Sequence, residues 1–365
     1  MTQAANLGAL GTNAGTTGIL ASTGGGTGTT AGVTGFKNRI INGAMVIDQR
    51  NAGASGTASS AYPVDRWQYQ ASQASKVTWQ QNAGSVTPPA GFTNYLGITS
   101  SSAYSVTSGD YFFLSQHIEG YNIADLGWGT ANAKTVTLSF WVRSSLTGTF
   151  GGAIRAGGFD QSYPFTYTIS SANTWEYKTI TITGATSGTF GSTNGTGFQL
   201  DIGLGVGSTF SGTAGAWSGS NLVSATGATS VVGTNGATFY ITGVQLEVGS
   251  TATSFDYRPY GTEFQLCQRY FEAGSVWREG TNAANGNFCV FTSSFLVQKR
   301  ANATFTYGNV GGANAGVASI QGPEATYEWI SPYDQTNVRT GFAFRFVTNN
   351  NTSTLRQYFT ASAEL

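Results

Sequence analysis

The chain has 365 residues, and only 9 % of them are charged, with 17 acidic side chains balancing 17 basic ones. This balance gives no electrostatic reason to expect nucleic acid or an anionic membrane surface as a partner. Aromatic residues make up 13 % of the chain, which is enough apolar mass for a packed core and argues against a disordered protein.

Targeting and metal signals are weak in this sequence. Residues 1–35 have neither the basic start nor the apolar run of a signal peptide, and no window is apolar enough to predict a membrane span. Two cysteines, Cys267 and Cys289, are too few for a secreted disulfide framework or, with a single distant histidine, for a structural zinc site. We expect both to be small packing residues.

The first segment, residues 1–36, is a low-complexity run rich in glycine and threonine, without a periodic apolar face. By itself it cannot offset the entropy of ordering its own backbone. One interpretation is a flexible tail. The other is a docking arm that becomes ordered against neighbouring subunits.

From residue 37 to residue 260 the pattern is that of β-strands with apolar residues at every second position, separated by loops rich in glycine, serine and threonine. In 135–143, for example, Leu138 and Phe140 are expected to point inward and Trp141 outward. This patterning predicts an all-β domain, an antiparallel jelly-roll β-sandwich. The expected strands are 39–47, 65–69, 76–81, 110–118, 135–143, 179–183, 198–206 and 238–248.

A module boundary is predicted near residue 260. The alternation in 238–248 shifts phase at Gly243, as expected of a β-bulge. Pro259 then ends the extended run, because proline fixes φ and cannot donate to a strand ladder. Thr262 with Gln265 reads as a capping box that starts a short helix, with Phe264, Cys267 and Phe271 on one face.

The remaining chain, residues 261–365, is predicted to form that helix and then a second small β-sandwich domain. Its aromatic residues alternate with polar ones, as in Phe342, Phe344 and Phe346. The expected strands are 288–297, 303–307, 326–330, 341–347 and 355–361.

Several segments resemble phage virion and tail-fibre proteins that contain a jelly roll like that of carbohydrate-binding modules. The resemblance implies a virion protein, a fibre, an appendage or a sugar-binding protein, and its motifs carry no catalytic signature. Residues 1–36 and 273–360 match less well. The segments that carry it are NRIINGAMVIDQR (38–50), YPVDRW (62–67), KTVTLSFWVRSS (134–145), NTWEYKTITITG (173–184), NGATFYITGVQLEVG (235–249), FDYRPYGTEFQLCQRYFE (255–272) and AEL (363–365).

The titratable residues are interpreted as structural. His117, the only histidine, is expected to be packed, and Asp201 lies on the polar face of its strand. Hydrolysis of glycans would need two converging carboxylates, but the acids are scattered, and Asp48, Asp65 and Asp256 are better explained by ion pairs with Arg50, Arg66 and Arg258. No cofactor is expected, although Asp48, Glu247 and Asp256 are the oxygen donors that a structural calcium would use.

Aromatic side chains are the expected binding chemistry, because sugar rings stack their apolar faces on tryptophan and tyrosine. Each candidate is also explained by core or subunit packing. The candidate carbohydrate-binding residues are Trp141, Trp277, Trp329, Tyr333, Asp334 and Arg339, of which the last four form a distal cluster.

The sequence therefore predicts a structural virion protein that adheres to host surface glycans and is not an enzyme. Residues 1–36 would attach it to other virion proteins, and a homotrimer is expected, since low-charge sheets need covered edges. A head-decoration role, a glycan-degrading tailspike enzyme and a secreted bacterial adhesin module are the alternatives.

Overall fold

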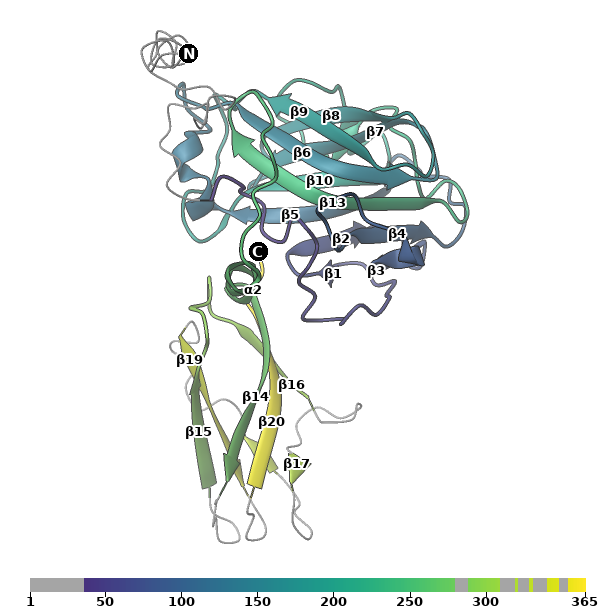
Figure 1. The fold of residues 1–365 in the computed structure, drawn as a ribbon. Helices are drawn as coiled ribbons and strands as arrows, with labels where there is room; N and C mark the ends of the chain where they lie inside the picture. The colour runs from purple at the N-terminus through teal and green to yellow at the C-terminus, as the bar shows by residue number, and fades with distance from the viewer. Residues whose placement is uncertain (1–35, 280–287, 309–318, 321–327, 331–339, 348–353) are drawn as a thin grey trace, which may run out of the picture.

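The computed structural model describes residues 36–279, 288–308, 319–320, 328–330, 340–347 and 354–365, and its larger part is a sandwich of two antiparallel sheets (Figure 1). One sheet has six strands in the order β1-β2-β5-β10-β7-β8, and the other has five in the order β3-β4-β13-β6-β9. Successive strands such as β5, β6 and β7 alternate between the sheets, as in a jelly roll. The all-β fold class expected from the sequence is confirmed.

The strand bounds of the sandwich are as follows. The six-stranded sheet contains β1 (Ala61–Val64), β2 (Trp67–Ala71), β5 (Tyr111–Glu119), β7 (Gly148–Ala156), β8 (Ser162–Ile169) and β10 (Thr196–Val206). The five-stranded sheet contains β3 (Val77–Gln81), β4 (Leu96–Ser100), β6 (Val136–Ser144), β9 (Glu176–Ile182) and β13 (Thr238–Val248). A parallel pair, β11 (Ser211–Gly212) and β12 (Ser224–Ala225), and three 3-10 turns, Ala83–Ser85, Gly120–Asn122 and Ala124–Leu126, lie in the connections.

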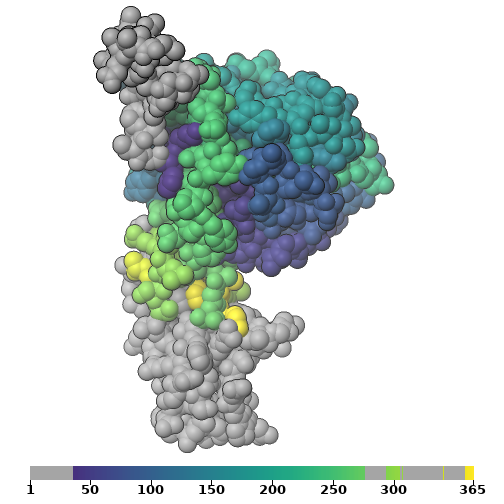
Figure 2. Space-filling view, in the orientation of Figure 1, coloured from purple at the N-terminus to yellow at the C-terminus, as the bar shows by residue number. Residues whose placement is uncertain are grey.

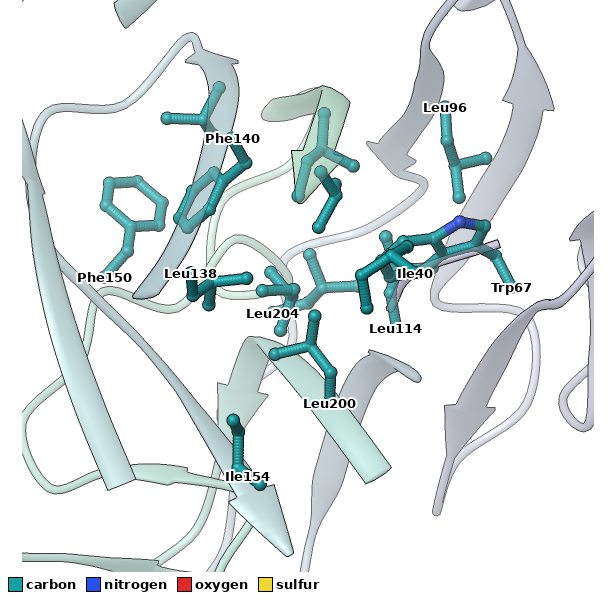
Figure 3. Packing of buried hydrophobic residues seen from close by; sticks show 14 of the residues in the cluster. Ile40, Trp67, Leu96, Leu114, Leu138, Phe140, Phe150, Ile154, Leu200 and Leu204 are labelled. Carbon is teal, nitrogen blue, oxygen red and sulfur yellow. The ribbon is translucent and has the colours of Figure 1, made fainter. Parts of the chain in front are cut away.

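The core lies between the sheets and is built from the alternating apolar residues (Figure 3). Leu138 and Phe140 of β6 are fully buried, as are Leu200 and Leu204 of β10, which confirms the inward positions expected from the sequence. Val206, expected on the same face, is half-buried, because it lies beyond a register shift between Gly203 and Gly205. Burial of each such side chain stabilises the fold by roughly 1.5–3 kcal/mol.

Residues 39–47 were expected to form a strand and instead form a turn between extended segments. Asn42 and Met45 have positive φ angles of 57° and 58°. The Asn42 side chain takes the place of a strand partner: its Nδ2 donates to the carbonyls of Ile47 and Asp65, and its Oδ1 accepts from the Ile47 amide. Asparagine tolerates such backbone angles and bonds its own neighbourhood in this way.

The helix α2 (Tyr260–Gln268) confirms a short helix after the sandwich, but its start differs from the prediction. Pro259 occupies the N-cap position and no side chain caps the helix, so the expected capping box of Thr262 and Gln265 is wrong. Phe271 was expected on the helix and begins β14 instead. Cys267 is fully buried in a cluster with Ile41, Ile47 and Tyr270, which confirms its packing role.

Beyond α2, two further antiparallel sheets form the second β unit, below the sandwich in Figure 1. One sheet joins β14, β20 and β16, with β17 also on β20, and the other joins β15, β19 and β18. Their bounds are β14 (Phe271–Glu279), β15 (Phe288–Ser294), β16 (Thr304–Gly308), β17 (Ser319–Ile320), β18 (Glu328–Ile330), β19 (Gly341–Val347) and β20 (Thr354–Ser362).

Residues Ala363 to Leu365 return from β20 to the sandwich. The Glu364 carboxylate accepts hydrogen bonds from Arg50 and Arg66, and Leu365 packs against the cluster around Cys267. Arg300 donates to the carbonyls of Ala363 and Glu364. We call the Glu364–Arg50–Arg66 set the junction clasp. Within the described parts of the chain, no helix has both the length and the apolar character needed to cross a bilayer.

Candidate functional site

Trp141 lies on the outer face of the five-stranded sheet, as its position in the alternation predicts. It is half-buried, and its ring lies 5.4 Å from that of Tyr177, its partner in the register of β6 and β9. Tyr177 is 43 % exposed. The two rings therefore present aromatic surface to solvent.

The bulge at Gly243 brings a third ring to this pair. The register of β13 against β6 shifts between Thr242 and Gln245, which confirms the bulge expected at Gly243. Gly243 has φ of 61°, and a Cβ at this position would lie 2.6 Å from the Phe92 ring and 3.1 Å from Trp141. Glycine is thus required both for the backbone angle and for the close approach of the two rings.

Two more rings extend this surface toward α2. The Phe92 ring lies 5.1 Å from Phe255 and 5.5 Å from Tyr257, and these two lie 4.8 Å apart. Tyr257 is 57 % exposed, and its hydroxyl donates to the carbonyl of Gly91. We call this set the aromatic strip; it comprises Tyr177, Trp141, Phe92, Phe255 and Tyr257.

The chain that carries Phe255 and Tyr257 is held on the sheet by buried polar side chains of β13. Glu247 accepts hydrogen bonds from the amide and hydroxyl of Thr253, and Gln245 Oε1 accepts from the amide of Asp256. Figure 2 shows this green stretch beside the purple chain that begins at Phe36. These bonds hold the backbone on either side of Phe255 against the sheet.

A pocket of about 190 Å³ opens at the α2 end of the strip. Three stretches of the chain form it: the turn after Asn38, the loop at Phe92 and the segment that enters α2. Its lining residues are Asn38, Gly43, Ala44, Val46, Gly91, Phe92, Thr93, Phe255, Asp256, Tyr257, Arg258, Tyr260 and Glu263. The pocket thus combines aromatic walls with charged groups.

The charged groups of this pocket are held by defined contacts. The Arg258 side chain is 3 % exposed and forms an ion pair with Glu263 at 3.1 Å. Its NH1 and NH2 groups also donate to the carbonyls of Ile40 and Asn38, whereas its buried Nε has no hydrogen-bond partner. Asp256 Oδ2 accepts from the amides of Lys37 and Asn38.

The expected ion pairs of Asp48, Asp65 and Asp256 with Arg50, Arg66 and Arg258 are wrong. Asp48 instead accepts hydrogen bonds from the amides of Asn51 and Gly53 and so stabilises a turn. Asp65 pairs with Arg50 at 3.4 Å, not with Arg66. Arg66 lies in the turn after β1, with a positive φ of 71°, and pairs with Glu364. Asp256 accepts from backbone amides, and Arg258 pairs with Glu263.

The residues suggested for a calcium site do not fit one. The carboxylate oxygens of Asp48 accept hydrogen bonds within a turn. The two oxygens of Glu247 accept bonds from Thr253, and one oxygen of Asp256 accepts bonds from backbone amides. Calcium requires six to eight converging oxygens. Across the part of the chain that the structure describes, no group of three or more His, Cys, Asp or Glu side chains is placed to hold a metal ion.

The outer face of the six-stranded sheet carries a buried polar cluster. Arg155 donates from Nε to Asp201 Oδ2 at 2.5 Å, and its other nitrogens donate to Gln199 and Asn221. Burial raises the pKa of the Asp201 carboxyl, against the effect of Arg155. Asp201 was expected on the polar face of its strand, and the structure confirms this and pairs it there with Arg155, both side chains being covered from solvent.

His117 is packed, as predicted. Burial and three nearby arginines lower the pKa of its imidazole to about 3. Its Nδ1 has no hydrogen-bond partner among the described residues, and its carbonyl accepts from Arg66. An imidazole whose Nδ1 bonds no carboxylate of the described residues is not oriented as the histidine of a catalytic triad is.

A second hollow, of about 410 Å³, lies beside β11. Hydroxyl groups line it, together with Trp217. That indole packs edge-on against Trp128, Tyr163 and Phe190, and its Nε1 donates to Thr183. Its ring is thus committed to internal packing, so this hollow offers less aromatic surface than the strip.

Two of the other candidate residues lie in the second β unit. Trp277 lies in β14 opposite Arg356 of β20, and Trp329 lies in β18 opposite Phe346 of β19. Tyr333, Asp334 and Arg339 lie outside the described residues. The distal cluster therefore stays a prediction.

No family model and no curated protein matches this sequence. Among solved structures, a proposed sugar-binding protein from Bacteroides thetaiotaomicron is similar, with a TM-score of 0.35 and 14 % identity over 58 % of this chain and 100 % of that one. The tailspike protein 4 enzymatically active domain of Bacteriophage CBA120 follows, with a TM-score of 0.32 and 14 % identity.

That second match covers 58 % of this chain but only 22 % of the tailspike domain. A family 11 carbohydrate-binding module from a Clostridium thermocellum cellulosomal cellulase has a TM-score of 0.27 and 13 % identity over 55 % of this chain and 99 % of that one. We assign the fold from the strand topology of this chain itself.

Of the five residues of the aromatic strip, the sequence analysis identified only Trp141 as a candidate binding residue. Tyr177 had a signal, because in NTWEYKTITITG it shares the face of the polar residues Thr179 and Thr181 and not that of the apolar Ile180. Phe255 and Tyr257 lie in FDYRPY, an alternating aromatic run just before the predicted boundary. Phe92 had none, because only the fold of its loop brings it onto Gly243.

Proposed function

We propose that this protein is a non-catalytic adhesin that binds surface glycans through the aromatic strip. The observation that supports the proposal is a row of five rings on an outer sheet face, exposed at Tyr177 and Tyr257 and continuous with a pocket. Sugar rings stack their C–H faces on such aromatic groups, while neighbouring polar groups bond their hydroxyls.

The wider role follows from the sequence resemblance. We propose that the protein is part of a phage virion, as a tail fibre or similar appendage, with residues 1–36 as its attachment to other virion proteins and a homotrimer as its assembly. In a closely related form of this proposal, the protein attaches to the phage head as a decoration protein. The distal cluster around Trp329 would add a second contact with the host surface.

Binding without cleavage is the expected chemistry at the strip. The two carboxylates of the pocket already serve the fold, Glu263 through Arg258 and the Asn42 amide, Asp256 through two backbone amides. A glycosidase needs one carboxyl group free to donate a proton and another free to activate water or attack. Neither arrangement is built here.

The test is retention on immobilised capsular polysaccharide, followed by sizing of the polysaccharide. We expect retention with unchanged polymer length, and Trp141→Ala and Tyr177→Ala should each weaken retention about tenfold, since a stacked ring contributes on the order of 1 kcal/mol or more. Tyr121→Ala is the matched control, because Tyr121 is 61 % exposed and lies outside the strip.

Shortened polysaccharide chains would instead identify a glycan-degrading enzyme, and equal retention of all three variants would remove the strip as the binding surface. The attachment role is tested separately by deleting residues 1–36. If particles still incorporate the truncated protein, the arm is not the attachment.

A further inference from the structure

The sheet face that carries Trp141 and Tyr177 also carries a cation. Paired residues of neighbouring strands have their side chains on the same face of a sheet, so the register of the five strands gives the composition of this outer face. Among the strand residues that the register places there, only Arg143 of β6 and Glu247 of β13 are charged. These two residues therefore decide the charge that the sheet face presents.

The acid of this pair is covered. Glu247 is 3 % exposed. Its carboxylate accepts hydrogen bonds from the amide and hydroxyl of Thr253 and from the side-chain amide of Gln245. Arg143 is half-buried, so part of it reaches solvent. The charge that this outer face presents to a ligand is thus positive.

Arg143 differs from the other arginines of the sandwich in having no acid beside it. Residues 36–259 contain six arginines. Arg143 forms no ion pair with any described carboxylate, whereas a carboxylate pairs with each of the others, namely Arg39, Arg50, Arg66, Arg155 and Arg258. A guanidinium group keeps its charge throughout the physiological pH range. The positive charge at Arg143 is therefore not balanced within the described fold.

The guanidinium is positioned by two contacts that leave its outer nitrogens free. Its Nε donates to the carbonyl of Asn173 at 2.9 Å, and its central carbon lies 5.3 Å from the centre of the Tyr240 ring. The two terminal nitrogens donate to none of the described residues, and neither is buried. A planar guanidinium can donate two parallel hydrogen bonds to the two oxygens of one anion.

Arg143 lies beside the two rings at the open end of the aromatic strip. It follows Trp141 by two residues on the same face of β6, a separation of about 7 Å along the strand. Trp141 in turn contacts Tyr177, which is 43 % exposed. A sugar ring stacked on this pair has its substituents near the guanidinium.

We propose that the strip binds an acidic glycan, with an oxyanion of the stacked sugar paired with Arg143. The inference rests on the proposed glycan-binding function and specifies its ligand class. A neutral hydroxyl can accept only from one N–H and leaves the charge unbalanced, whereas an oxyanion accepts two charge-assisted bonds. A sugar carboxylate and a sulfate ester share this chemistry, and the experiment separates them.

The experiment measures binding to the full chain by ligand-observed NMR. The probes are methyl glucuronoside, its uncharged methyl ester, glucose 6-sulfate and glucose. We expect at least one of the two acidic sugars to bind about tenfold better than its neutral counterpart. The preference should shrink when salt is raised from about 0.05 M to about 0.5 M, because ions screen a partly exposed charge. Which acidic sugar is preferred identifies the oxyanion.

Arg143→Gln should remove the preference for the acidic sugar and leave binding of the neutral one unchanged. Arg143→Lys keeps the charge but not the two parallel N–H groups, so it should retain a smaller preference. Lys134→Gln is the matched control, because it removes the same charge from an exposed residue that precedes β6. Urea unfolding checks that each variant is folded.

Equal binding of the acidic and neutral sugars would overturn the inference, as would an Arg143→Gln variant that keeps the preference or a Lys134→Gln variant that loses it. Polysaccharide retention that still depends on Tyr177 would then leave the proposed function intact. Absence of both retention and sugar binding would overturn both.

Discussion

Asp65, which is buried, and His117, which is half-buried, affect stability in opposite directions. Burial raises the pKa of the Asp65 carboxyl to about 6, although Arg50 and Gln49 favour its charged form. Burial lowers the pKa of the His117 imidazole to about 3. The ordinary values are about 3.9 for aspartate and 6.5 for histidine, so both groups titrate differently in the folded and unfolded states.

The sign of each contribution follows from proton binding. Between about pH 4 and 6 the folded state holds the extra proton at Asp65, so this group makes stability fall as pH rises. Between about pH 3 and 6.5 the unfolded state holds the extra proton at His117, so that group makes stability rise with pH. The two slopes oppose each other across pH 4 to 6.

We predict that substituting either residue reveals the pH dependence of stability that the other one contributes. Urea unfolding of His117→Asn should show a free energy that falls by about 2 kcal/mol from pH 4 to pH 6, whereas Asp65→Asn should show a rise of similar size. The wild-type chain should be nearly flat over this range. Parallel profiles for the two variants would contradict the assignment.

For single residues, the sequence predicts well on which face of a strand a side chain lies, but it predicts poorly which residue that side chain pairs with. Trp141 and Leu138 lie on the faces that the alternation assigns, because the period of a strand fixes them. The partner of Arg66 is Glu364, 298 residues away in the chain. No local spacing encodes such a pairing, so the neighbouring Asp65 was the wrong choice.

The bulge in β13 is the element on which the strip depends. Gly243→Ala should destabilise the fold through both its positive φ and the clash of the new Cβ with Phe92. Strain at such a position and overpacking each cost about 1–3 kcal/mol. We expect a loss of about 3 kcal/mol by urea unfolding, together with weaker retention on polysaccharide.

Gly236 provides the matched comparison, because its φ is 73° and a Cβ there would meet nothing within 4 Å. Gly236→Ala should cost only about 1 kcal/mol, from the backbone angle, and should leave retention unchanged. If both variants lose the same stability and retention, Phe92 does not depend on the bulge.

Strands with clear alternation were predicted, whereas β7 and β8, in which the alternation is not visible, were missed. β6, β10 and β13 were expected within a few residues of their ends. β7 was missed because GTFGGAIRA carries few side chains that could show a pattern, and β8 because it contains Pro164. Proline is tolerated in β8 since this strand lies at the edge of its sheet.

At the scale of the whole molecule, the two β units meet through α2 and the residues that follow β20. The Arg66 side chain is 2 % exposed, and its guanidinium lies 3.6 Å from the centre of the Tyr270 ring. Glu119 accepts from Arg269 and from the Tyr270 hydroxyl. The sequence predicted a boundary here but not how it is held, because these contacts join residues far apart in the chain.

The clasp predicts how the two units are coupled. Glu364→Gln keeps the size and the acceptor oxygen but removes the only carboxylate that forms an ion pair with Arg66 within the described residues. Breaking a buried pair on one side costs roughly 3–5 kcal/mol, since a charge is left buried without compensation. We expect calorimetry to show one unfolding transition in the wild-type chain and two in the variant, with the second β unit melting first.

Asp125→Asn serves as the control for removing a carboxylate. Asp125 pairs with Arg39 near the surface, where the side chain of Asp125 is 47 % exposed and that of Arg39 is 22 % exposed. Exposed pairs contribute about 0–1 kcal/mol, so this variant should unfold like the wild type. If Glu364→Gln also unfolds like the wild type, the units are coupled by the apolar cluster around Cys267. In that case Cys267→Ser, which places a hydroxyl in that cluster, should separate the two transitions instead.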